Sequence, residues 1–133
     1  MRTVRVEPPE LGSVDGLAYA RFRPMGGRDV VPGGVVVLHG AGSCKESHFD
    51  FARLCRAAGL EAIAFDQRGH GESEGALGAS AVDDIARVAA LLAPGPLALR
   101  GSSMGGFMAL VAGAQLEAAA VVAICPAGAE QLR

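Results

Sequence analysis

The 133-residue sequence contains no tryptophan, one tyrosine and only 5% aromatic residues, so large ring side chains contribute little to its core. No uncharged apolar run approaches the roughly 20 residues that a membrane-spanning helix needs. Residues 1–6 lack the apolar stretch of a signal peptide, so we expect neither a targeting segment nor a membrane span. The three cysteines, Cys44, Cys55 and Cys125, are odd in number and lack metal-ligand spacing. They fit a reducing compartment, and we expect a cytoplasmic protein without a metal or cofactor.

An excess of either charge is also missing. Twelve lysines and arginines against fourteen aspartates and glutamates leave a formal net charge of −2. So small a net charge predicts attraction to neither nucleic acid nor a membrane surface. Half of the residues are apolar, and a chain of this length can bury roughly two-thirds of its unfolded surface. The sequence therefore predicts one soluble globular domain over residues 1–133.

Short apolar runs alternate with segments of helical periodicity. Strands are expected at residues 3–6, 17–23, 35–38, 63–65, 97–99 and 119–124. Helices are expected at residues 46–58, between a Ser80 cap and the stop at 94–96, and at residues 104–115. This alternation predicts an α/β fold, a doubly wound, mostly parallel sheet of about six strands with helices on both faces.

Two details of this pattern are specific enough to test. The first two strands are expected to form an antiparallel pair, separated by a turn-rich stretch around Pro8, Pro9 and Gly12. The helix at residues 104–115 is apolar all round, so it is expected to be largely buried.

The most informative motif is the run from Gly101 to Gly106, Gly-Ser-Ser-Met-Gly-Gly. It places Ser103 between an expected strand and an expected helix. A serine held at such a sharp turn exposes its hydroxyl, and crowding demands nearly side-chain-free residues two before and two after it. Gly101 and Gly105 meet that demand. The amide of Met104, at the helix start, is placed to face an oxyanion.

Two glycine-rich loops follow other expected strands. Residues 39–42, His-Gly-Ala-Gly, come directly after strand 35–38. An oxyanion hole needs a second amide from such a loop, and Ala41 is the candidate. Residues 66–73, Asp-Gln-Arg-Gly-His-Gly-Glu-Ser, follow strand 63–65.

In order and spacing, these three motifs resemble the α/β-hydrolase family, and most closely its lysophospholipase, monoacylglycerol-lipase and serine-aminopeptidase-like group. The resemblance covers essentially the whole chain. It implies that Ser103 is the nucleophile and that the amides of Ala41 and Met104 hold the oxyanion. It also implies that Asp66, Arg68 and His70 brace the second loop beside the site. The full set of supporting residues that it implies is His39, Gly40, Asp66, Arg68, His70, Gly101 and Gly105.

Histidine and aspartate are both missing after Ser103. In the family that the chain resembles, the triad runs serine, then aspartate or glutamate, then histidine. The only later carboxylates here are Glu117, Glu130 and the terminus. The chain therefore resembles the N-terminal half of such an enzyme, without its last strands, its lid and its final helix.

The remaining polar residues have simpler interpretations. His39 and His70 sit in loop motifs that support the fold in this family, so neither is expected to be the catalytic base. Asp83 and Asp84 are expected only to begin a helix. Three further expectations are a surface position for His48, a solvated strand end for Arg100, and an inert thiol for Cys44.

Two functions from different classes follow. The first is a serine hydrolase that cleaves a small carboxylic ester, thioester or amide through an acyl-enzyme on Ser103, with the triad acid and histidine missing from this chain. The second is a catalytically silent fragment or a scaffold that keeps only the front half of the fold. Because strand 119–124 is apolar, uncharged and at the sheet edge, we also expect self-association or binding of a complementary C-terminal segment.

Overall fold

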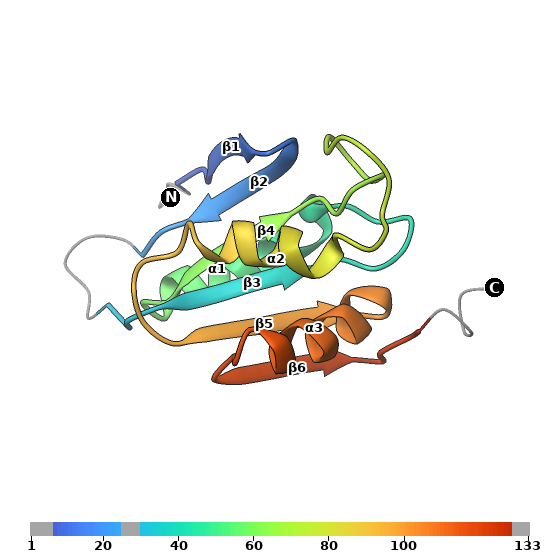
Figure 1. Ribbon diagram of the computed structural model, residues 1–133. Coiled ribbons are helices and arrows are strands. Elements are labelled where there is room, and N and C mark those ends of the chain that lie inside the picture. Colours follow the sequence, from blue (N-terminus) through green and yellow to red (C-terminus); the bar gives the residue numbers. More distant parts are fainter. Residues whose placement is uncertain (1–6, 25–29, 129–133) are drawn as a thin grey trace.

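The computed structural model describes residues 7–24 and 30–128 and contains a six-stranded sheet in the order β1-β2-β4-β3-β5-β6 (Figure 1). The strands are β1 Glu10–Val14, β2 Leu17–Phe22, β3 Gly34–Leu38, β4 Glu61–Phe65, β5 Leu97–Ser102 and β6 Ala120–Ile124. The pairs β4–β3, β3–β5 and β5–β6 are parallel, and β1 and β2 add an antiparallel edge. This topology confirms the expected fold class.

Helices cover both faces of the sheet. They are the 3₁₀ turn η1 Lys45–His48, α1 Phe49–Ala57, α2 Ala81–Ala89 and α3 Met104–Gln115. Ala52 and Cys55 of α1 form one core with alternate residues of β2, β3 and β4. Ile85 of α2 and Ala109 of α3 join the core on the opposite face. Because β3 is covered on both faces, all five of its residues are buried, which explains its continuous apolar run.

The first strand differs from the expectation. Residues 3–6 lie outside the described residues, and the strand that pairs with β2 is β1. Gly12, expected in a turn, pairs with Tyr19 inside the ladder. The hairpin turn is instead Asp15-Gly16, with φ angles of 50° and 80°. An Asp-Gly pair supplies the two positive φ angles that a tight hairpin requires.

The helix starts and helix burial also need correction. Ser80 occupies the N-cap position of α2, but its side chain makes no capping hydrogen bond. Helix α3 has the expected bounds, yet Phe107 and Leu110 are 41% and 49% exposed. In the part of the chain that the structure describes, only the side of α3 that faces the sheet and α2 is covered, so apolar composition alone overestimated its burial.

Strand β6 forms one edge of the sheet in the described part of the chain. Val121 packs toward α3, so the alternate residues Ala120, Val122 and Ile124 point to the face on which α1 lies. All three are exposed, Val122 at 53%. No helix among residues 7–24 and 30–128 is long and apolar enough to cross a membrane.

Candidate active site

Ser103 occupies a strained turn where β5 ends and α3 begins. Its backbone angles are φ 55° and ψ −119°, which an L-residue rarely adopts. The Ser103 amide donates to the carbonyl of Ile124 at 2.9 Å, and the Ser103 carbonyl accepts from the amide of Ala127 at 3.0 Å. The last residue of β6 and the segment after it therefore hold the turn from the other side, a contact that the sequence did not indicate.

Glycines make this turn possible. A side chain at Gly105 would run into the main chain of β3, 2.5 Å from the carbonyl oxygen of His39. A side chain at Gly101 would meet the main chain of Gly105 and the amide nitrogen of Gly106, the latter at 2.8 Å. Strand β5, helix α3 and the end of β3 thus approach more closely than any larger residue allows.

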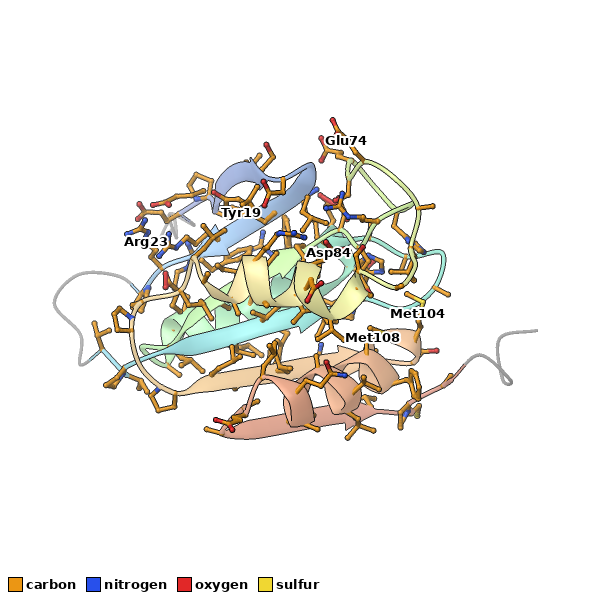
Figure 2. All side chains as sticks on the ribbon, in the orientation of Figure 1. Tyr19, Arg23, Glu74, Asp84, Met104 and Met108 are labelled. Carbon is orange, nitrogen blue, oxygen red and sulfur yellow. The ribbon has the colours of Figure 1, made fainter. Side chains whose placement is uncertain are left out.

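The loop after β3 lies against Ser103. A Cβ atom added to Gly40 would stand 3.4 Å from the Cβ of Ser103. Ala41 follows in an exposed turn, which the amide of Ser43 closes on the carbonyl of Gly40 at 3.1 Å. Met104, at the start of α3 (Figure 2), carries one of the amides that have no partner within a helix.

His39 is fully buried, and both ring nitrogens have partners. Its Nε2 accepts from the amide of Gln67 at 2.9 Å, and its Nδ1 lies 2.7 Å from the carbonyl of Gly40. This pattern requires a neutral ring with the proton on Nδ1. Burial, with a contribution from the neighbouring His70, lowers the pKa of His39 below its ordinary value. His39 is therefore a structural link between two loops.

Asp66 is a fully buried carboxylate at the end of β4. It accepts from the amide of Lys45 at 2.7 Å, from the Lys45 ammonium at 2.8 Å and from the amide of Glu72 at 3.0 Å. Burial alone would raise the pKa of Asp66, but these donors outweigh it and hold the pKa below its usual value. Gly71 passes so close to this carboxylate that no side chain fits there.

Arg68 connects the second loop, residues 66–73, to helix α2 and to the turn between β1 and β2. Its Nε donates to Asp84 at 3.0 Å and its terminal nitrogen to the carbonyl of Asp15 at 2.9 Å. Figure 2 shows Asp84 on α2, beneath the loop that carries Glu74. Asp84 is 3% exposed, so it does more than begin a helix. The His70 ring stands 4.9 Å from that of His39.

Two expectations for polar residues are wrong. His48 is half-buried, and its Nδ1 lies 3.1 Å from the Arg100 guanidinium. Arg100 stacks over the ring of Phe51 at 4.1 Å, beneath α1, and is not a solvated strand end. Burial, with the nearby charge of Arg100, lowers the pKa of His48. Cys44 is half-exposed, 3.7 Å from the hydroxyl of Ser47.

Lys45 and Gln67 are residues of this region that the sequence did not indicate, and Lys45 is the less expected of the two. Its side chain is only 2% exposed and reaches three carboxylates. A lysine next to two polar residues at a helix start is ordinarily solvated. The sequence feature that could have indicated the burial of Lys45 lies 21 positions away: Asp66 directly follows a buried strand and needs a partner.

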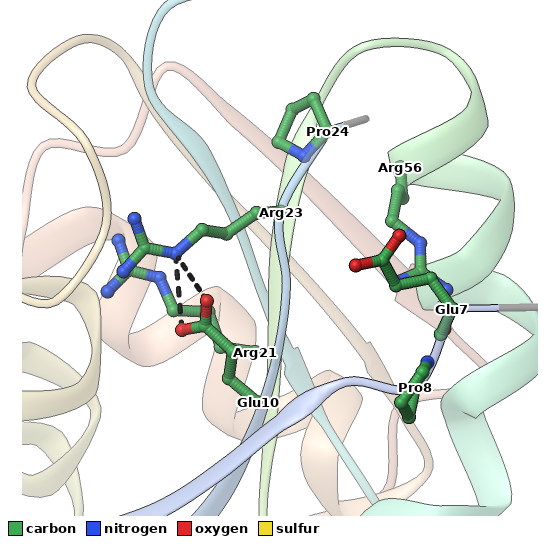
Figure 3. Close-up of a pocket in the computed structure, with 7 residues that line it drawn as sticks. All are labelled: Glu7, Pro8, Glu10, Arg21, Arg23, Pro24 and Arg56. Carbon is green, nitrogen blue, oxygen red and sulfur yellow. Dashed lines mark hydrogen bonds and ion pairs between the residues drawn. The ribbon is translucent and has the colours of Figure 1, made fainter. Parts of the chain in front are cut away.

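A hollow of about 300 Å³ lies at the opposite end of the sheet (Figure 3). Three arginines border it, and two of them are bound to carboxylates: Arg21 to Glu61 at 2.7 Å and Arg23 to Glu10 at 3.1 Å. This hollow is at the amino ends of the parallel strands, whereas Ser103 follows a carboxyl end. Among the described residues, no three His, Cys, Asp or Glu side chains are grouped to hold a metal ion.

The sheet order, the two helical layers and the loops at the carboxyl ends of the strands define an α/β-hydrolase fold. The family model described as "Serine aminopeptidase, S33" matches residues 31–133, and the chain belongs to that family. This match confirms the resemblance drawn from the three motifs. No curated protein sequence matches the chain.

Solved structures with this fold include two monoacylglycerol lipases. A soluble variant of the Saccharomyces cerevisiae monoglyceride lipase is 25% identical with a TM-score of 0.63, over 86% of this chain and 42% of its own. The Paleococcus ferrophilus monoacylglycerol lipase is 28% identical with a TM-score of 0.63, over 83% and 43%. A Xanthomonas campestris α/β serine hydrolase without a lid shares the fold at 24% identity and a TM-score of 0.67, over 90% and 62%. The chain thus spans about two-fifths to three-fifths of these relatives.

Proposed function

We propose that this chain carries the nucleophile half of a serine hydrolase, with Ser103 as the attacking residue. The observation that carries the proposal is the strained backbone of Ser103, at a strand-to-helix turn that packs against Gly40. Strain of this kind persists only where the surrounding structure enforces it, and it is concentrated at reactive sites. A nucleophile elbow has this backbone arrangement.

The proposed chemistry is acyl transfer. The Ser103 oxygen bonds to the carbonyl carbon of the substrate, and the carbonyl oxygen becomes an oxyanion. The amides of Ala41 and Met104 donate to that oxyanion. When this intermediate collapses, its bond to the leaving group breaks, and that group takes up the proton that Ser103 lost and departs as an alcohol, thiol or amine. Water then attacks the acyl-enzyme, which releases the acid and returns a proton to Ser103.

A base must take the proton of Ser103, and His39 and His48 are unsuited to that role. Both ring nitrogens of His39 are already hydrogen-bonded, and His48 contacts Arg100 beneath α1. His70 contacts the carbonyl of Arg68 at 3.2 Å, and within residues 7–24 and 30–128 no hydrogen bond joins Ser103 to a histidine ring. We propose that the histidine and its acid come from polypeptide beyond these 133 residues, in keeping with relatives of about twice the length.

The proposed substrates are carboxylic esters first, with thioesters or amides as further members of the class. Support comes from the two lipases among the structural relatives, which act on monoacylglycerols. A silent scaffold is the alternative, and what favours it is the same lack of a histidine in contact with Ser103.

A fluorophosphonate probe tests the proposal, because it phosphonylates activated serines. We expect slow labelling of the chain at one site, located by mass spectrometry at Ser103. Labelling should disappear in Ser103→Ala and persist in Ser102→Ala, which removes the neighbouring hydroxyl. Labelling that survives Ser103→Ala contradicts the assignment, and a chain that is never labelled favours the scaffold.

A further inference from the structure

Lys45 is a buried lysine surrounded by carboxylates. Its Nζ lies 2.8 Å from Asp66, 2.8 Å from Glu72 and 3.0 Å from Glu46. Burying a charged pair costs so much desolvation that an apolar pair of similar volume is often equally stable or more so. Stability alone therefore does not explain this lysine, and the geometry that it imposes is the better explanation.

Asp66 holds Lys45 at two points. One carboxylate oxygen accepts from the Lys45 amide at 2.7 Å, and the other accepts from its ammonium at 2.8 Å. A main-chain and a side-chain contact from the same partner determine both the position and the direction of the backbone there. Lys45 is where the segment 40–44 ends.

The next residue, Gln67, holds the other end of that segment. The Gln67 amide donates to the ring of His39 at 2.9 Å, and its side-chain amide donates to the carbonyl of His39 at 2.9 Å. Segment 40–44 is thus fixed at both ends, by Asp66 and Gln67, which are consecutive residues at the carboxyl end of β4. Between those ends it lies against Ser103.

We infer that Lys45 is a positioning residue: together with Asp66 it holds segment 40–44 so that the Ala41 amide points at the oxyanion formed on Ser103. This inference rests on the function proposed above. Lys45 itself contacts no reacting atom and transfers no proton. An oxyanion donor works only when it is preorganised, and a displacement of about 1 Å can cost roughly 10²-fold in rate.

Both members of the pair are charged at neutral pH. Burial by itself lowers the pKa of Lys45, but the carboxylates of Asp66, Glu72 and Glu46 outweigh it and raise the pKa above its ordinary value. The pKa of Asp66 is lowered in turn. A lysine in this state is a fixed cation and is unsuited to act as a base.

Two measurements on the whole chain test this role: the rate of fluorophosphonate labelling at Ser103 and the hydrogen exchange of residues 40–44. In Lys45→Met we expect labelling to slow by about 10²-fold and the segment to exchange faster. Lys45→Arg keeps a cation and should recover most of the rate. Asp50→Asn is the matched control, because Asp50 is a fully exposed carboxylate on α1 that pairs with Arg53 and not with Lys45, and it should change neither quantity.

Lys45→Met leaves Asp66 buried without its cation, so this variant can fail to fold. The double variant Lys45→Met/Asp66→Asn removes both charges and is measured beside it, with thermal melting of every variant. A folded double variant that labels and exchanges like the parent overturns the inference. If the parent is never labelled at Ser103, the proposed function fails, whereas exchange of residues 40–44 still decides whether Lys45 orders them.

Discussion

Buried polar side chains order the loops at the carboxyl ends of β3 and β4. His39, Asp66 and Gln67 are nearly inaccessible to water, and each makes hydrogen bonds to main-chain groups of the other loop. A buried polar group without a partner costs about 1–3 kcal/mol, so these loops have few alternative conformations. At the scale of single residues, the candidate site is therefore held in place by buried polar groups that each need a hydrogen-bond partner.

The neutral ring of His39 predicts a loss of stability in mild acid. Its pKa is lowered in the folded protein by burial, with Gly40 and the charges of His70, Asp66 and Glu46 as smaller influences. The unfolded chain therefore takes up the proton first, and unfolding becomes easier. Stability is complete above about pH 6.5, the ordinary value, and falls as the pH drops toward the folded pKa. The slope is at most about 1.4 kcal/mol per pH unit for one histidine.

Urea unfolding at a series of pH values from neutral to mildly acidic measures this effect. His39→Gln should lower the free energy of unfolding at pH 7 and flatten its pH dependence. His48→Gln is the companion variant, because the pKa of His48 is also lowered and accounts for any slope that remains. A free energy of unfolding that does not change between neutral and mildly acidic pH contradicts the interpretation of His39.

Close packing at the start of α3 predicts that Gly105 tolerates no substitution. A methyl group there would enter the main chain of β3 beside His39. We expect Gly105→Ala to lower the free energy of unfolding by about 1–3 kcal/mol, the usual cost of overpacking. Gly78→Ala is the matched control, since no atom lies within 4 Å of its added Cβ. Equal urea midpoints for the two variants would show that the turn accommodates a methyl group at position 105.

Among the elements, β6 stands out because it serves two purposes. Its last residue and the segment after it hold Ser103 through two main-chain hydrogen bonds. Its other side is an apolar edge on which Val122 and Ile124 are exposed. The strand that is exposed at the sheet edge is thus the same strand that holds the turn of Ser103.

This edge predicts self-association of the 133-residue chain. An apolar strand without charges offers unpaired amide and carbonyl groups to a neighbour. We expect Val122→Lys to reduce the apparent mass in light scattering at micromolar concentration. Leu11→Lys is the matched control, because Leu11 is 73% exposed on β1, the opposite edge strand. A stable monomer with cooperative melting in the parent chain would rule out association through β6.

The whole molecule has two unlike ends. Ser103 and both glycine-rich loops lie at the carboxyl ends of the parallel strands. The hollow bordered by Arg21, Arg23 and Arg56 lies at the amino ends (Figure 3). In open α/β sheets, ligands bind outside the carboxyl ends of the strands. The hollow bordered by these three arginines is therefore not the expected substrate site.

For the molecule as a whole, we predict very weak turnover. Loss of a triad member typically costs about 10⁴-fold or more and leaves roughly 10³–10⁴ over water from the oxyanion hole and binding. The purified chain should hydrolyse p-nitrophenyl acetate barely above the buffer rate. Brisk turnover that Ser103→Ala abolishes would show that a histidine of this chain, with His70 the first to test, serves as the base.

Much of the architecture followed from local patterns. The alternation of apolar runs and helical segments predicted the α/β class, and the bounds of α3 and β6 were predicted to within a residue. The glycines around Ser103 predicted its tight turn. These features are encoded within a few consecutive residues, because backbone conformation responds mainly to neighbouring side chains. One exception was β1, where alternation was weak and the Asp15-Gly16 turn was overlooked. Another was α2, which ends at Ala89, before the expected stop at residues 94–96.

The contacts that define the candidate site came only from the tertiary structure. Lys45 meets Asp66 across 21 positions, His39 meets Gln67 across 28, and His48 meets Arg100 across 52. Composition likewise did not reveal which side of α3 would stay exposed. The physical reason is that such pairings depend on strand order and on which elements cover each face. By itself, the sequence determined the strands, the helices and the strained serine, and the packing of β3 against β4 and β5 decided which side chains surround it.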